Sequence, residues 1–297
     1  MPLNTIRQPS SGEIIELTDW IEATMVAEQR NKISRSRLRR YFRNMMIVDE
    51  NDLEIHLELI FQEINRRKQI TQNYYPFSEE GSGTQFRSDE ETLPYIFLLL
   101  LTMSEPLRSE KRQGQVEILL DMLVLDALSQ YLSGESKGVR FGWPRSGDRP
   151  PSFPQAIEWL AGQLGLPVGK GEKRLERKDA GVDVVVWRPF RDEREGYVTI
   201  LAQCTVAFDW APKAKDIIID LWRGYIDFGK DPIICIAIPF VIPQPFAKWD
   251  ELRRTVHFVL DRLRICELIG NSELKYKNEI TDWISTELEK ISEIKKS

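Results

Sequence analysis

Apolar residues recur at helical spacing through most of the first 135 residues. The segment around Asp19 to Ala27 places its apolar residues on one side of a helix. Ser34 suits the N-cap of a short basic helix that follows it. Further helical patterns cover residues 53–70, 90–103 and 113–132. Residues 74–87 and 133–154 are predicted loops because they are rich in Gly, Ser and Pro, so the N-terminal part is expected to be all-helical.

The pattern changes after residue 154, where short β-rich runs bounded by Gly or Pro alternate with helices. An amphipathic helix over Lys213 to Phe228 supplies the crossover that a pair of parallel strands needs. The predicted order is helix 156–164, strands within 181–190 and 196–206, this crossover helix, a strand within 232–242, a strand and short helix within 255–265, and a C-terminal helix. We therefore expect a helical domain over residues 1–140 and an α/β domain with a mixed sheet over residues 141–297.

Composition places the chain among ordinary folded, soluble proteins. Its 297 residues are 42% hydrophobic and 29% charged, and the length suits two domains. The longest apolar run, Tyr95 to Met103, is roughly half of the ~20 residues that a membrane helix needs, and the N-terminus lacks a secretory signal. The spacing of the three cysteines predicts neither a disulfide framework nor a zinc knuckle. We expect a cytoplasmic protein with no membrane contact.

The net charge of −5 means that any contact with nucleic acid must come from a local basic patch. The best candidate is the segment Lys32 to Arg43, which contains no acid and suits phosphate contacts. Its predicted DNA-binding residues are Arg35, Arg37, Arg39, Arg40 and Arg43. A basic helix that faces an acidic segment such as Glu13 to Glu28 is an equally good interpretation.

Polar residues interrupt the two apolar strands of the predicted hairpin. Asp183 opens the first strand in KDAGVDVVVW, and Gln203 lies within the second in ILAQCTVAFDW. Side chains alternate between the faces of a strand, so one hairpin can bring both groups to the same rim of the sheet. The alternatives are structural: Asp183 and Asp179 as turn residues, and Gln203 as a buried hydrogen-bonding residue. Glu158, on the preceding helix, is either a further site acid or a solvated surface residue.

Over residues 152–269 this arrangement resembles the PD-(D/E)XK, or restriction-endonuclease-like, nuclease superfamily. In that family an Asp on one strand and a Glu-x-Lys on its neighbour converge at the edge of the sheet, often with a Glu from the preceding helix. The resemblance implies that Asp183, Gln203 and Glu158 bind Mg²⁺ or Mn²⁺. Gln203 stands in place of the usual Glu, and Thr205 occupies the lysine position. The amine would then come from Lys213 or Lys215, each of which also suits an ordinary position at a helix start.

The resemblance implies a metal-dependent DNA endonuclease of a bacterial restriction or anti-phage defence system. A catalytically inactive nuclease-like subunit that binds DNA or assembles a larger complex is the alternative, favoured by Gln203 and Thr205. The sequence leaves open a helicase or ATPase partner protein and a homo-oligomeric state. The two histidines, His56 and His257, lie far apart in the sequence, and no glycine-rich phosphate-binding motif occurs, so other common catalytic sites are disfavoured.

Overall fold

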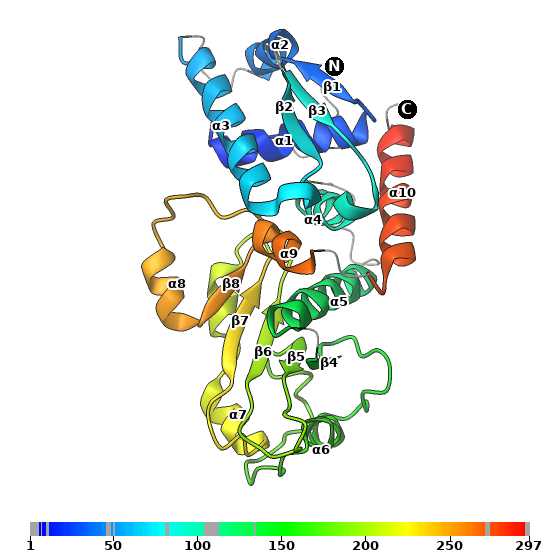
Figure 1. Cartoon of the computed structure of the whole chain (residues 1–297), viewed down its shortest axis with the longest axis vertical. Coiled ribbons are helices and arrows are strands. Elements are labelled where there is room, and N and C mark those ends of the chain that lie inside the picture. The colour runs from blue at the N-terminus through cyan, green and yellow to red at the C-terminus, as the bar shows by residue number, and fades with distance from the viewer. Residues whose placement is uncertain are drawn as a thin grey trace. The chain divides into compact units, whose positions relative to one another are not determined.

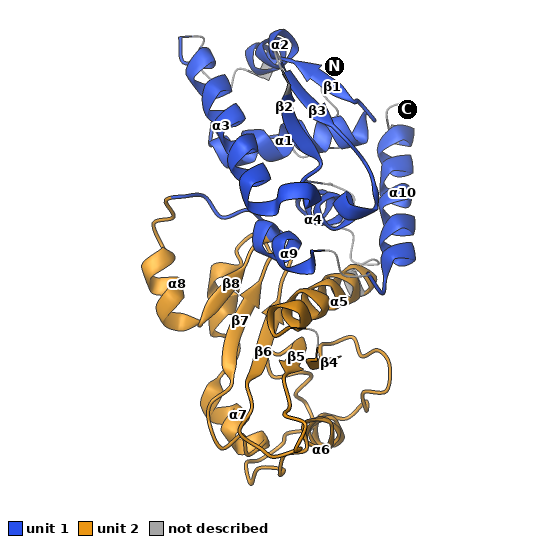
Figure 2. Ribbon diagram, in the orientation of Figure 1, with its two compact units in different colours: residues 1–110, 239–244, 262–297 blue, residues 111–238, 245–261 orange. Residues whose placement is uncertain are grey.

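The computed structural model describes residues 6, 8–9, 12–45, 49, 51–80, 83–103, 113–133, 135–270 and 274–294 (Figure 1). The chain forms two compact units, coloured separately in Figure 2. Unit 1 comprises residues 1–110, 239–244 and 262–297, and unit 2 comprises residues 111–238 and 245–261. Neither unit is continuous in sequence, so this division differs from the one expected at residue 140.

Unit 1 contains helices and one small antiparallel sheet. Its helices are α1 (Ile14–Ala27), α2 (Arg35–Met45), α3 (Leu53–Thr71), α4 (Leu93–Met103), α9 (Arg262–Ile269) and α10 (Lys277–Ile294), with the short 3₁₀ turns η1 (Gln72–Tyr74) and η2 (Glu90–Thr92). Its strands, in sheet order, are β1 (Lys32–Ser34), β3 (Gly83–Phe86) and β2 (Phe77–Glu80). The apolar α4 packs against α1, α9 and α10, and the rings of Phe97 and Trp283 meet edge to face.

The expectation of an all-helical N-terminal domain is not confirmed, because the predicted loop at 74–87 contains two strands. Phe77 and Phe86 face each other across the β2–β3 pair, with ring centroids 5.2 Å apart. This cross-strand pair stabilises a hairpin that the nearby Gly and Ser residues conceal in the sequence. The predicted helices of this part are confirmed, and the Ser34 hydroxyl accepts the Arg37 N–H at 3.3 Å, as expected of an N-cap.

Unit 2 is an α/β unit built on a mixed five-stranded sheet. The strands, in sheet order, are β4 (Lys137–Arg140), β5 (Val184–Trp187), β6 (Thr199–Cys204), β7 (Ile233–Ala237) and β8 (Phe258–Leu260). The pairs β4–β5 and β5–β6 are antiparallel, whereas β6–β7 and β7–β8 are parallel. The helices are α5 (Gln113–Tyr131), which packs against β4, β5 and β6, α6 (Phe153–Leu164), α7 (Ile219–Tyr225) and α8 (Trp249–Thr255).

The β-rich runs predicted after residue 154 are confirmed as β5, β6, β7 and β8, followed by α9 and α10. Two details differ. The predicted loop at 133–154 contains β4, which is short and polar. The crossover predicted over Lys213 to Phe228 is a 3₁₀ helix, η5 (Ala211–Lys215), followed by α7, because Ile218 is extended between them.

The assignment of helices to the two units also differs from the prediction. Helix α5, expected in the N-terminal domain, covers the sheet of unit 2, while the C-terminal α9 and α10 belong to unit 1. Among the helices that the structure describes, none has the length and apolar character needed to cross a membrane.

Candidate metal centre

Three potential metal ligands from three elements of unit 2 converge where β5 begins and β6 ends. Asp121 lies on α5, Asp183 directly precedes β5, and Cys204 ends β6. One carboxylate oxygen of each acid and the Cys204 sulfur all lie within 4.8 Å of one another. Because α5 packs across β4, β5 and β6, it carries Asp121 to the ends of these strands.

The backbone around Asp183 is fixed on both sides. Its N–H donates to the Ala202 carbonyl at 2.8 Å, and its carbonyl accepts the N–H groups of Phe141 and Gly142 at 2.7 and 2.9 Å. Its carboxylate accepts the N–H of Cys204 at 2.7 Å. These bonds extend the β5–β6 pairing by one residue, so the Asp183 side chain is held beside the end of β6.

Gly142 lets the backbone approach both carboxylates. A Cβ atom added there would lie 2.6 Å from Asp183 Oδ1 and 3.0 Å from Asp121 Oδ2. The first distance is well inside van der Waals contact, so no other residue fits here without displacing the acids.

Arg140, the last residue of β4, supplies the positive charge at the cluster. The residue is only 7% exposed, and its Nε donates to Asp121 Oδ2 at 2.8 Å. Its Nη1 donates to the carbonyls of Gly142 and Pro144 and to the Ser146 hydroxyl. Its Nη2 is buried and has no hydrogen-bond partner among the described residues.

The cluster is electrostatically costly without a further cation. Burial raises the pKa of Asp121 to about 7, although Arg140 pulls this pKa down. Burial, and then the charge of Asp121, raises the pKa of Asp183 well above its usual range. Burial and the two carboxylates also raise the pKa of the Cys204 thiol. A dication would favour the charged forms of all three groups.

Gln203 follows Ala202, the last residue of β6 that pairs with β5. Its side chain leaves β6 on the face opposite to that of Cys204, because successive side chains of a strand alternate. The Gln203 amide nitrogen reaches its own neighbour's carbonyl at 3.4 Å, while its Oε1 is buried and has no partner among the described residues.

The other predicted site residues lie elsewhere. Glu158 is exposed on α6 and is not part of the described group of ligand atoms around Asp183; Asp121 provides the helical acid instead. The Nζ atoms of Lys213 and Lys215 lie 3.2 Å from carboxylate oxygens of Asp216 and Glu251, respectively. The cation that contacts the cluster is therefore Arg140 rather than either predicted lysine.

Asp179 is a turn former, as the structural alternative expected. Its carboxylate accepts the N–H of Gly181 at 3.0 Å and that of Trp143 at 3.2 Å. Asp179 thereby ties the segment that follows β4 to the segment that leads into Asp183.

Sequence reasoning missed Asp121 because it sought the helical acid after residue 152. A signal was present: Glu117 and Asp121 are spaced i, i+4 on a helix whose other central residues are almost all apolar. An acid at a buried position of such a helix needs a partner, and this need marks it as a candidate functional residue.

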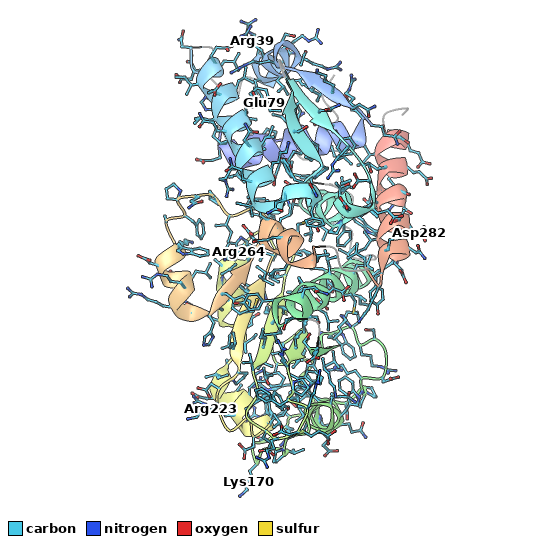
Figure 3. The ribbon with its side chains drawn as sticks, in the orientation of Figure 1. Arg39, Glu79, Lys170, Arg223, Arg264 and Asp282 are labelled. Carbon is cyan, nitrogen blue, oxygen red and sulfur yellow. The ribbon has the colours of Figure 1, made fainter. Side chains whose placement is uncertain are left out.

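The basic helix α2 of unit 1 faces acids on α3. Arg35 donates to Glu58 at 3.1 Å, and Arg39, labelled in Figure 3, pairs with Glu54. Arg37 donates to the Tyr41 hydroxyl at 2.9 Å. Arg40 and Arg43 are exposed. Acids of α3 thus pair with Arg35 and Arg39, so part of the basic character of α2 is neutralised locally.

Comparisons of the chain with models of protein families, with curated proteins and with solved structures gave no match.

Proposed function

We propose that unit 2 is a metal-dependent phosphodiesterase of the PD-(D/E)XK type that acts as a DNA endonuclease. The observation that carries the proposal is the convergence of Asp121 and Asp183 at the ends of β4, β5 and β6. An antiparallel β5–β6 pair, with a parallel β7 reached through α7, supports the restriction-endonuclease-like fold that the sequence resembles. An acid before one strand and a polar residue near the end of the next are two features of that family, whereas its lysine position holds Thr205.

The donor set fits a divalent cation. The two carboxylates are ligands that Mg²⁺ and Mn²⁺ accept, and the resemblance adds the amide oxygen of Gln203. The Cys204 sulfur is a poor ligand for Mg²⁺. A bound cation would polarise a phosphate and lower the pKa of a bound water.

In this proposal Arg140 supplies the positive charge that the lysine supplies in the family. Its guanidinium is buried and held by Asp121, so its charge is fixed next to the acids. An arginine does not exchange its proton at neutral pH, and therefore Arg140 would stabilise negative charge on a phosphate without acting as a base.

The segment after β4 offers contacts for nucleic acid beside the cluster. Trp143 is 41% exposed, and its backbone N–H donates to the Asp179 carboxylate. Arg145, two residues further on, is also exposed. An exposed aromatic ring next to a basic residue suits base stacking and phosphate contact. The setting we propose is a cytoplasmic restriction or anti-phage system, with a helicase or ATPase partner or a second copy of the chain.

The second candidate is a catalytically inactive nuclease-like subunit that binds DNA or assembles a complex. It is favoured by Thr205 at the lysine position and by the pairing of Lys213 and Lys215 with other acids. On this alternative the cluster has a structural role.

Incubation with plasmid and single-stranded DNA in Mg²⁺ or Mn²⁺ separates the two candidates. The nuclease proposal predicts cleavage by the native chain, loss of cleavage in Asp183→Ala, and native cleavage in the control Glu158→Gln. Cleavage that survives in Asp183→Ala would refute the proposed site. No cleavage, together with DNA binding that falls steeply with salt, would favour the inactive subunit.

A further inference from the structure

Cys204 is a ligand type that distinguishes this cluster from an ordinary Mg²⁺ site. Its sulfur lies within 4.8 Å of a carboxylate oxygen of Asp121 and of Asp183. Mg²⁺ takes hard oxygen ligands, whereas a thiolate favours softer ions such as Zn²⁺. A site that includes this sulfur should therefore select its metal differently from an all-oxygen site.

The number and spacing of the donors fit a zinc site with one open position. Catalytic zinc sites hold the ion with three protein ligands and leave the fourth position to water or substrate. At ordinary zinc–oxygen and zinc–sulfur distances, tetrahedral ligand atoms lie about 3.3 to 3.7 Å apart. The three atoms, found within 4.8 Å of one another, would need to close by at most about 1.5 Å, a shift that side-chain rotation can supply.

One buried polar atom beside the cluster independently points to an absent ligand. The Nε and Nη2 atoms of an arginine form one edge of the planar guanidinium. Nε of Arg140 donates to Asp121, so Nη2 points along the same edge toward the cluster, where it has no partner among the described residues.

A buried donor without a partner is unfavourable, because it has lost its hydrogen bonds to water. The water or hydroxide of a hydrated dication at the cluster would accept from Arg140 Nη2.

We infer that Asp121, Asp183 and Cys204 bind a zinc-class transition-metal dication in preference to Mg²⁺, with a water or hydroxide at the fourth position facing Arg140. Binding converts the Cys204 thiol to a thiolate and releases its proton to solvent. The inference deepens the proposed function by naming its metal, and it rests on that proposal only for the catalytic use of the ion.

Cobalt spectroscopy tests the inference without reference to activity. The full chain, freed of metal with a chelator, is titrated with Co²⁺, whose bond to a thiolate gives a charge-transfer band in the near ultraviolet. The same titration is run on Cys204→Ser and on the control Cys266→Ala, which alters a buried thiol on α9 of unit 1, outside the cluster. Circular dichroism establishes that each variant is folded.

The expected result is one thiolate–cobalt band per native chain, removed by Zn²⁺ but retained in a thousandfold excess of Mg²⁺. Cys204→Ser should lose the band and bind Zn²⁺ more than about tenfold more weakly, while Cys266→Ala keeps both properties. A native chain without the band, or a Cys204→Ser chain that retains it, overturns the inference.

A second measurement uses the native chain alone and so does not depend on the folding of a variant. Zn²⁺, but not Mg²⁺, should protect Cys204 from alkylation, as followed by mass spectrometry of its peptide. Equal alkylation with and without Zn²⁺ would contradict the inference. A chain that shows the cobalt band but does not cleave DNA would support the metal site and count against the nuclease proposal. A chain that cleaves DNA in Mg²⁺ but shows no band would support the nuclease proposal and overturn the thiolate metal site.

Discussion

Replacing Arg67 by Met should destabilise unit 1 strongly, because this arginine is fully buried among acids. Its guanidinium donates to Glu63 at 2.8 Å, to Asp19 at 2.6 Å and to Glu22 at 3.0 Å, and its side chain is 0% exposed. Arg66, the next residue on α3, pairs with the same Glu63 at 2.7 Å but is 27% exposed. It provides a matched control.

The size of the destabilisation follows from the partners that each acid keeps when Arg67 is replaced. Asp19 keeps two bonds of 2.9 Å from Arg262, and Glu63 keeps Arg66. Glu22 keeps two tyrosine hydroxyls and only a distant arginine nitrogen at 4.0 Å, so one buried charge is left uncompensated. Breaking a buried ion pair in this way costs about 3–5 kcal/mol. For Arg66→Met we expect no more than about 1 kcal/mol.

Hydrogen exchange of the α1 and α3 amides reports the free energy of opening for unit 1 separately from unit 2. Adding Glu22→Gln to Arg67→Met should recover at least about 1 kcal/mol, because the uncompensated charge is then absent. Equal protection in Arg67→Met and Arg66→Met would refute the reasoning, since burial would then not determine the cost.

Three further predictions concern the site, the buried tyrosines and the basic helix. Gly142→Ala should weaken metal binding and lower the free energy of unfolding by about 1–3 kcal/mol, because the added Cβ would lie 2.6 Å from an oxygen of Asp183. In the control Gly162→Ala nothing lies within 4 Å of the added Cβ, so thermal unfolding should show a neutral or stabilising effect. Burial raises the pKa of Tyr95 well above its usual value of 10, so above about pH 10 only the unfolded chain loses this proton and the free energy of unfolding falls as pH rises. In urea titrations, Tyr95→Phe should reduce the slope of unfolding free energy against pH by up to about 1.4 kcal/mol per pH unit. An unchanged slope would contradict the raised pKa. Arg40→Ala should lower DNA affinity and reduce its salt slope by about 1 in binding titrations if α2 contacts phosphate, and unchanged binding would exclude Arg40 from the interface.

Most of the strands and helices of unit 2 could be predicted because they follow simple periodic patterns. The run Val184 to Trp187 is continuously apolar and fully buried, as expected for a central strand. Strand β4 could not be predicted, since Val139 is its one apolar side chain and only Arg140 among its four residues is buried. A short edge strand forms because its neighbour offers a partner, and that information is absent from the local sequence.

The candidate site was predictable only in part for a similar reason. Asp183 and Gln203 lie at the same end of the β5–β6 pair, which periodicity indicates. Asp121 and Arg140 reach the cluster through the packing of α5 on the sheet and through the pairing of β4, both of which are long-range contacts. The pairing of Lys213 and Lys215 with Asp216 and Glu251 likewise depends on how η5 ends and where α8 lies.

The most direct test of the central claim compares DNA cleavage by Asp121→Asn and Glu158→Gln with cleavage by the native chain, across a titration of Mn²⁺ and Zn²⁺. An asparagine oxygen can still accept the Arg140 hydrogen bond, so Asp121→Asn removes the charge while leaving the packing of α5 intact. A metal centre at Asp121 and Asp183 predicts a loss of about 100-fold or more in Asp121→Asn and a native rate in Glu158→Gln. Native cleavage by Asp121→Asn, or loss of cleavage in Glu158→Gln alone, would contradict the account.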